Sequence, residues 1–320
     1  MTARQTGAAL LTAMLTVALV ASMAAAALWQ QWRGVEVEAA ERTRTQSLWV
    51  LTGALDWARL ILREDARSGG ADHLGEPWAV PLEEARLSTF LAADKNATVD
   101  SEEALTQVFL SGSITDLQGR MNVLNLVEDG KVSLPWFKAF SRLFEQLGLP
   151  LSELATVAEN LRFAQDNSPD NGSSLMASLL PQRVGQLRWL GLSDSSLVKL
   201  GEFITLLPVR TPVNLNTASV TVLRACIPTL DQAQAQRLAT SRQTKHFGTF
   251  NDAGLVVPEI SGELNHLQHS VNSLFFEVQG RLRLDQTVVQ ERSVVQREGL
   301  NVKTLWRDRG GQAPPITALQ

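Results

Sequence analysis

The first pattern in the chain is a long apolar run near its start. Residues 8–28 contain no charged side chain, and their polar interruptions are the hydroxyls of Thr12, Thr16 and Ser22. An α-helix rises about 1.5 Å per residue, so about 20 residues cross the roughly 30 Å hydrocarbon core of a bilayer. Hydroxyl side chains can bond back to the helix and therefore do not spoil a span. The run predicts a transmembrane helix.

The helical pattern continues beyond the apolar run. Apolar residues recur at spacings of three and four, at Leu48, Leu51, Leu55, Ala58 and Leu62. This spacing indicates an amphipathic helix. Proline is absent up to residue 67, and Ser68, Gly69 and Gly70 then break the pattern. We therefore predict one helix over residues 8–67, with a transmembrane half at 8–28 and an amphipathic second half.

The middle of the chain passes from loop and strand signals to helical ones. Residues 72–81, DHLGEPWAVP, are typical of a structured loop in which Pro77 adds stiffness and Trp78 packs inward. Residues 105–127 mix β-type residues with turn signals. From residue 133 the period becomes helical. One predicted helix face consists of Phe137, Phe140, Leu143, Phe144 and Leu147.

Strand signals return near the end of the chain. Apolar and polar residues alternate over residues 274–284, which is the period of a half-buried strand. A second β-rich run, residues 287–297, follows a two-residue break and predicts a hairpin. The tail, residues 307–320, is rich in Gly, Pro and Arg, and we expect it to be flexible.

The order of these signals predicts an α+β fold. A chain of 320 residues is long enough for two domains. The simplest arrangement is one α/β domain, formed by residues 68–132 and 266–306, with a helical domain of residues 133–265 inserted into it.

Net charge and cysteine content reduce the number of possible functions and structural features. The formal net charge is -4, so no global basic field points to nucleic acid. Cys226 is the single cysteine, which excludes an intramolecular disulfide. A lone cysteine of this kind is usually a small buried hydrophobic residue.

Signatures of catalysis are missing from the sequence. It contains no Gly-x-Ser-x-Gly elbow, no phosphate-binding Gly-Lys-Ser/Thr loop and no nucleotide fingerprint. His266 and His269 are three residues apart and could share a metal on a helix, but no third ligand is evident nearby. His73 lies near Asp72 and Glu76, where a turn histidine is the simpler interpretation. An enzyme is therefore disfavoured.

Three interpretations of the N-terminus stay open on these residues alone. An ordinary secretory signal would be cleaved after the apolar stretch, near the alanines at 24–27. A plain signal anchor would hold a soluble domain at the membrane. A prepilin-type leader would be cut before the apolar segment, and Gly7 stands at that polar-to-apolar junction.

Three polar motifs follow one another along the chain: DHLGEPW at residues 72–78, DLQGRMNVLNL at 116–126 and PVNLNTAS at 212–219. In these motifs, and from its leader to about Gly299, the chain resembles the minor pseudopilin K of type II secretion systems, the general secretion pathway protein K family. The resemblance implies a pseudopilin α/β fold with a large inserted all-helical domain, SAM-like or helix-hairpin-helix-like. It also implies a non-enzymatic subunit at the pseudopilus tip, which primes filament assembly and supports protein export across the outer membrane.

Processing and partners are implied by the same resemblance. A prepilin peptidase would cleave the leader, residues 1–7, after Gly7 and N-methylate Ala8. The chain would be anchored once in the inner membrane with its bulk in the periplasm. Its partners would be the minor pseudopilins I and J and the major pseudopilin.

Position five of that mature chain is Thr12, where most pilin-like proteins carry Glu. An unpaired carboxylate inside a bilayer is costly. A tip subunit has no terminal amine above it to pair with a carboxylate, so an uncharged Thr12 fits that place. An ordinary membrane helix with an ordinary Thr explains the position equally well.

The chain departs from the family in the helical domain. The acidic stretch that the family associates with calcium is reduced to LRFAQDNSPDNGSSLMASLL, residues 161–180, where Asp166 and Asp170 remain as oxygen donors. Calcium takes about six to eight oxygens. A solvated polar turn is therefore favoured over a calcium site.

The strongest alternative function is a membrane-anchored DNA-binding protein of the DNA-uptake type. VNLNTAS and the apolar residues after it resemble a helix-hairpin-helix repeat, which grips phosphate through backbone N–H groups of a Gly-hydrophobic-Gly hairpin. The matching residues 228–231 lack both glycines, and Asp231 would repel a phosphate. We therefore expect the fold of that module without nucleic-acid binding.

Overall fold

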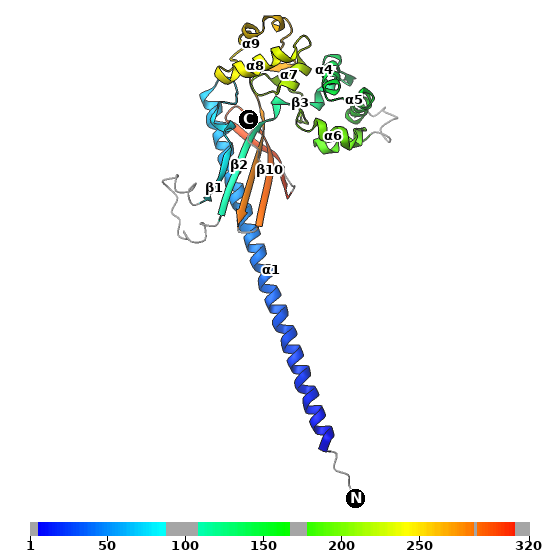
Figure 1. The fold of residues 1–320 in the computed structure, drawn as a ribbon, viewed down its shortest axis with the longest axis vertical. Helices are drawn as coiled ribbons and strands as arrows, with labels where there is room; N and C mark the ends of the chain where they lie inside the picture. Colours follow the sequence, from blue (N-terminus) through cyan, green and yellow to red (C-terminus); the bar gives the residue numbers. More distant parts are fainter. Residues whose placement is uncertain (1–5, 88–107, 167–177, 285–286, 311–320) are drawn as a thin grey trace. The chain divides into compact units, whose positions relative to one another are not determined.

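The structure is a computed structural model, and it describes residues 6–87, 108–166, 178–284 and 287–310. It divides into two units, residues 1–53 and 54–320. Helix α1 (Thr6–Ser68) supplies the described part of the first unit and the start of the second (Figure 1). The helix ends where Gly69 and Gly70 adopt φ angles of 67° and 118°, which favour glycine. The predicted helix break is confirmed.

Within the larger unit, the last turns of α1 pack on the sheet. The predicted stripe is confirmed in this unit, since its three members there are buried: Leu55, Ala58 and Leu62. Leu55, Ala58 and Leu62 share a core cluster with Trp78 and Phe276. Trp78 lies on the 3-10 helix η1 (Pro77–Ala79) and meets the Phe276 ring edge-on at 5.2 Å. Its predicted inward packing is confirmed.

The sheet has five antiparallel strands in the order β1-β2-β9-β10-β11. The strands are β1 (Leu82–Arg86), β2 (Val108–Asp116), β9 (Phe275–Leu284), β10 (Thr287–Glu298) and β11 (Asn301–Arg309). The predicted hairpin is confirmed, because β9 pairs with β10 from Leu284 and Thr287 onward.

The helices α4 to α9 follow one another between β5 and β8 and gather at one end of the sheet (Figure 1). They are α4 (Leu134–Gln146), α5 (Leu151–Gln165), η4 (Val184–Leu190), α6 (Asp194–Leu200), α7 (Val220–Cys226), α8 (Gln232–Thr244), α9 (Phe250–Val256) and η5 (Pro258–Ile260). The predicted α+β class is confirmed.

Short strands connect these helices to the rest of the chain. β3 (Met121–Asn122) pairs in parallel with β6 (Ile204–Thr205), and β7 (Val213–Asn214) pairs in parallel with β8 (His269–Ser270). β4 (Val127–Glu128) and β5 (Lys131–Val132) form a small hairpin. The 3-10 helices η2 (Leu117–Gly119) and η3 (Val123–Leu126) flank β3.

The helices bury one apolar cluster. Phe140, Leu143 and Phe144 of the predicted α4 face are buried in it, and Phe137 and Leu147 pack against its edge. Cys226 at the end of α7 is 1% exposed in the same cluster. Burial raises the pKa of its thiol to about 12, so the expectation of a small buried hydrophobic side chain is confirmed.

One prediction about the C-terminus is wrong. The flexible tail was expected from Arg307, but strand β11 continues to Arg309. Its last residues are held because the buried Glu291 carboxylate on β10 pairs with Arg309 at 2.7 Å and with Arg307 at 3.8 Å. Composition alone indicated disorder, whereas Arg307 and Arg309 pair with a carboxylate on the neighbouring strand. Residues 311–320 lie outside the described part.

Candidate functional site

The apolar side chains in the first half of α1 are exposed, and no other described part of the chain packs over them. One helix among the described residues is long and apolar enough to cross a membrane, and none of its most apolar window is buried. Its leucines are widely open, for example Leu11 at 69% and Leu15 at 72% exposed. Apolar patches of this extent mark contact with lipid or with other proteins. The helix therefore fits a single-pass membrane anchor.

The hydroxyl groups in this helix are satisfied inside it. Thr12 Oγ1 donates to the carbonyl oxygens of Ala8 at 3.1 Å and Ala9 at 3.0 Å. Thr16 bonds back to Ala13 and Ser22 to Leu19, each at 2.9 Å. The expected back-bonding is confirmed. Thr12 therefore needs no partner from another chain.

Aromatic residues follow the apolar run. Trp29 and Trp32 are each 61% exposed, and the Arg33 guanidinium lies 5.7 Å from the centre of the Trp29 ring. Tryptophan and arginine at the end of an apolar helix are typical of a membrane–water interface. The end of the span at residue 28 stays a prediction.

The predicted cleavage point lies in the first turn of the helix. α1 begins at Thr6, so the peptide bond between Gly7 and Ala8 is already helical. No residue in this turn is acidic. Cleavage after Gly7 and methylation of Ala8 stay predictions.

The second and third of the motifs that carry the family resemblance meet at one buried carboxylate. Asp116, the first residue of the second motif, is 4% exposed. Its Oδ2 accepts hydrogen bonds from Thr217 Oγ1 at 2.5 Å, Ser273 Oγ at 2.6 Å and Asn214 Nδ2 at 3.1 Å. Its Oδ1 accepts from the Gln118 backbone N–H at 2.7 Å. Burial raises the pKa of Asp116, and these hydrogen bonds oppose that rise.

The first motif joins the same network through Asp72. Asn214 Nδ2 donates to the Asp72 carbonyl at 3.1 Å, and the Ser273 N–H donates to the Asp72 carboxylate at 2.7 Å. Arg297 on β10 pairs with Asp72 and with Asp65 of α1, and it also donates to the Ser273 carbonyl at 2.9 Å. We call Asp65, Asp72, Asp116, Asn214, Ser273 and Arg297 the polar junction.

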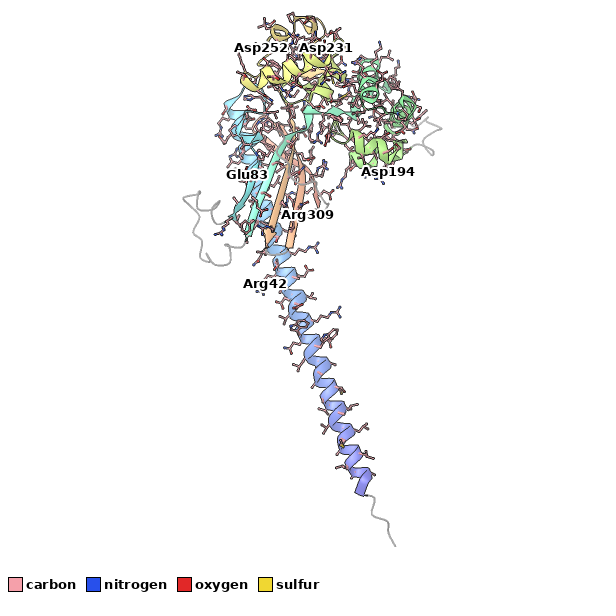
Figure 2. All side chains as sticks on the ribbon, viewed as in Figure 1. Arg42, Glu83, Asp194, Asp231, Asp252 and Arg309 are labelled. Atoms are coloured by element: carbon pink, nitrogen blue, oxygen red, sulfur yellow. The ribbon has the colours of Figure 1, made fainter. Side chains whose placement is uncertain are left out.

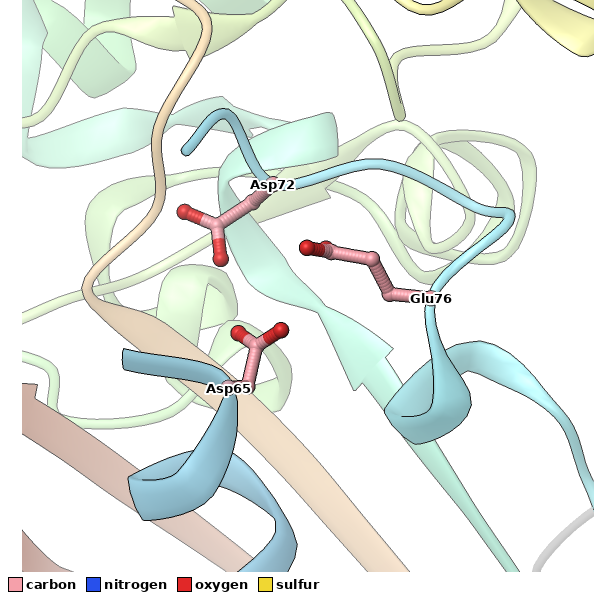
Figure 3. Close-up of side chains that lie close together, drawn as sticks. All are labelled: Asp65, Asp72 and Glu76. Atoms are coloured by element: carbon pink, nitrogen blue, oxygen red, sulfur yellow. The ribbon is translucent and has the colours of Figure 1, made fainter. Parts of the chain in front are cut away.

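Three carboxylates gather at one side of the polar junction. Asp65, Asp72 and Glu76 point toward one another, with oxygens within 4.8 Å (Figure 3). Arg297 already supplies a cation to the first two, and Glu76 accepts from the His73 N–H and from Trp78 Nε1, both at 2.8 Å. Burial raises the pKa of Asp65, and the neighbouring Glu76 adds to that rise. We interpret the group as an ion-pair network built around arginine.

The polar junction was not foreseen from the sequence. Its members come from α1, the loop after it, β2, β7, the loop between β8 and β9, and β10, so no local pattern links them. A signal was nevertheless present, since each of the three motifs sets an Asp or Asn beside turn-forming residues. That composition is typical of side chains that cap backbone turns.

The histidine pair at 266 and 269 does not lie on a helix. His269 is in strand β8 and is 1% exposed, while His266 is exposed and packs against the Phe250 ring at 4.6 Å. Burial lowers the pKa of His269 to about 4, so the buried ring is neutral at neutral pH. The helical spacing that could have joined them at a metal is therefore absent.

The hairpin at residues 228–231, which corresponds to the phosphate-binding hairpin of a DNA-binding module, lies beside acidic side chains of the protein itself. The Thr229 N–H, between α7 and α8, donates to the Glu263 carboxylate at 3.2 Å. Asp231 caps α8, and Asp252 lies in the first turn of α9 (Figure 2). Carboxylates at the helix starts repel phosphate where a DNA-binding hairpin would attract it. The DNA-binding alternative is not supported.

The candidate calcium ligands are only partly described. Asp166 is the C-cap of α5, and Asp170 lies outside the described residues. The expectation of a solvated polar turn rather than a calcium site at Asp166 and Asp170 stays a prediction.

Residues 213–272 match the family model of type II secretion system protein K. The matched stretch starts at β7, next to Asn214, and ends one residue before Ser273. A type II secretion system protein K from Pseudomonas aeruginosa is 28% identical over 329 residues, which covers 96% of this chain and 90% of the relative. The resemblance to type II secretion system protein K is confirmed.

The protein K resemblance extends to the fold. The crystal structure of the GspK-GspI-GspJ complex from the enterotoxigenic Escherichia coli type II secretion system contains a chain that matches with a TM-score of 0.65. Sequence identity to that chain is 18%, and the match covers 85% of this chain and 99% of that one. The two chains share a fold.

Proposed function

We propose that this protein K relative is a minor pseudopilin, a structural subunit that helps to assemble the pseudopilus of a type II secretion system. The main support for this proposal is that one chain combines two features. One is an apolar helix with its hydroxyls satisfied and its leucines uncovered. The other is a protein K fold that carries no catalytic motif. In this proposal the helix holds the chain in the inner membrane, and the rest lies in the periplasm.

The partners in the proposal are counterparts of GspI and GspJ, since those chains accompany GspK in the Escherichia coli complex. Inside lipid, helices associate by close packing between small residues. Ala18, Ala21, Ser22 and Ala25 offer such residues on the exposed span. The major pseudopilin would extend the filament behind this complex, and a prepilin peptidase would mature each subunit.

The assembly role is tested by enlarging the small residues. Ala18 and Ala21 are both changed to Phe in the full chain, and the counterparts of GspI and GspJ are recovered from detergent extracts by affinity purification. We expect recovery to fall roughly tenfold, because larger side chains hold the helix backbones apart. The matched control changes Ala39 and Ala40 to Phe, in the exposed part of α1 beyond the apolar run. Equal recovery from both variants would contradict the proposed docking.

A tip position for the subunit is supported by the uncharged position five. Thr12 satisfies itself, whereas a carboxylate there would require a partner in the bilayer. We expect Thr12→Glu to reduce both recovery of the partners and secretion, and Thr12→Gln to have a smaller effect. Full activity of the Glu variant would place the subunit elsewhere in the filament.

A further inference from the structure

Two histidines that lie far apart in sequence are stacked face to face. His73 is in the loop between α1 and η1, and His246 follows α8. Their ring centroids are 3.8 Å apart and the ring planes differ by 8°. His73 is partly buried and His246 is exposed. Water and protons therefore reach the pair from the His246 side.

The backbone on both sides of the stack is held by one short segment. Asn214 Nδ2 donates to the carbonyl of Asp72, directly before His73, at 3.1 Å. Asn216 Nδ2 donates to the carbonyl of Phe247, directly after His246, at 2.9 Å, and Asn216 Oδ1 accepts from the Phe247 N–H at 2.8 Å. Both asparagines are buried. The stack is thus a built contact rather than a chance meeting of surface rings.

The geometry favours neutral rings. His73 Nδ1 accepts a hydrogen bond from the Gly75 N–H at 3.1 Å, so this nitrogen carries no proton. Protonation would turn the acceptor into a donor that faces another donor. Charging both rings would also place two positive charges about one ring spacing apart, which is repulsive.

Some groups around the stack favour the charged form of His73, and others favour its neutral form. Asp65 and Asp72 attract a proton to His73, but both carboxylates are paired with Arg297. Glu76 is engaged by the His73 N–H, and Lys245 precedes His246. Burial, reinforced by His246, lowers the pKa of His73 below its ordinary value.

We propose that the His73–His246 stack is a pH-sensitive latch between the loop that follows α1 and the end of α8. The latch is closed when the rings are neutral and opens when acid charges them. Opening frees the α8 end of the helical region from the loop, while Asn214 and Asn216 still hold the neighbouring backbone. The latch would make the attachment of the helical region looser in acid than at neutral pH.

Hydrogen exchange on the full chain in detergent tests the latch. Exchange is followed by mass spectrometry at pH 7.5 and 5.5, with correction for the intrinsic rates, over peptides that cover residues 73–76 and 245–248. Because a histidine pKa is about 6.5 when unperturbed, we expect local opening to increase by about tenfold per pH unit below that value. The same peptides should be equally protected from pH 8.5 to 7.5.

Two variants distinguish the latch from general acid loosening. In His246→Phe the repulsion between two charged rings is lost, and a single His73 cation over a phenyl ring is attractive. The acid response should therefore be clearly smaller than in the wild-type chain, and the remainder should come from burial of His73 and its contact with Gly75. His266→Phe, the matched control, should keep the wild-type response. The absence of an acid response in the wild-type chain, or an undiminished one in His246→Phe, would overturn the proposal. As a second readout, proton NMR should show the His73 pKa rising in His246→Phe, since a positive neighbour is removed.

Discussion

The apolar half of α1 and the polar junction satisfy their polar groups in opposite ways. In the helix, Thr12, Thr16 and Ser22 bond to carbonyls three or four residues before them. In the junction, the Asp116 carboxylate is reached from Asn214 and Ser273, which are 98 and 157 residues away along the chain.

Because of this difference, the two regions are suited to different roles. A segment that satisfies its own polar groups can enter lipid without help from the rest of the chain. A junction that depends on distant partners can form only when the whole unit has folded, so it fixes how the elements are arranged.

Removing the cation of the junction should have the largest effect. Arg297→Ala leaves Asp65 and Asp72 without their counter-charge in a buried site, which costs about 3–5 kcal/mol of unfolding free energy. Denaturant unfolding of the full chain in detergent would measure it. The matched control is Arg67→Ala, whose partner Glu64 is exposed. Equal losses in the two variants would contradict a special role for the junction.

The loss in Arg297→Ala should depend on pH in a defined direction. Burial raises the pKa of both Asp65 and Asp72 in the folded protein, and loss of Arg297 raises these pKa values further. The penalty is therefore complete above the raised folded pKa values, where both carboxylates are charged, and it is relieved as the pH falls through those values toward the unfolded carboxyl pKa of about 3.9. Unfolding at pH 7 and at pH 4 should show a smaller loss at pH 4.

The second prediction concerns a buried polar group with a local partner. His269 Nδ1 accepts from the Asn265 N–H four residues before it, and burial lowers its pKa from about 6.5 to about 4. The folded state therefore favours the neutral ring, so its contribution is complete above pH 6.5 and is lost as the pH falls toward 4. The unfolding free energy should fall by roughly 3 kcal/mol over this interval. His269→Gln should flatten that slope, whereas the exposed His266→Gln should keep it.

The third prediction weakens the junction without removing a side chain. Asp116→Asn keeps the shape but replaces an oxygen that accepts three hydrogen bonds with a group that also donates. We expect a loss of about 2 kcal/mol in unfolding free energy, because buried donors are left without acceptors. Thr217→Val removes one of the three donors and should cost less. A neutral Asp116→Asn variant would show that the junction tolerates mismatched donors.

The smallest effect is expected in the membrane half. Thr12→Val removes a hydroxyl that bonds only to carbonyls of its own helix, so stability, membrane retention and partner recovery should stay unchanged within measurement error. Detergent extraction and affinity recovery would measure this. A clear loss of partner recovery would mean that the Thr12 hydroxyl contacts another chain.

Local patterns predicted much of the fold. The period of the apolar residues gave α1 and its break at Gly69, the alternation gave the β9–β10 hairpin, and motif composition indicated the loop that buries Trp78. These features depend on residues close together in sequence. The same is true of the hydroxyls in the membrane half.

The remaining features depend on distant partners. Strand β11 was missed because its arginines look like a flexible tail until Glu291 is placed beside them. The spacing of His266 and His269 allowed a helix, but His269 lies in a strand that exists only because β7 pairs with it across the helical region. The sequence pattern likewise did not predict that Asp72, Asp116 and Asn214 lie close together.

Intact mass and N-terminal sequencing would show whether the apolar helix is the mature N-terminus of a pilin-like subunit. The protein would be isolated from membranes of cells with and without active prepilin peptidase. We predict a chain that begins at methylated Ala8 with the peptidase and at Met1 without it. A chain that begins near Ala27, or at Met1 in both cases, would contradict the claim.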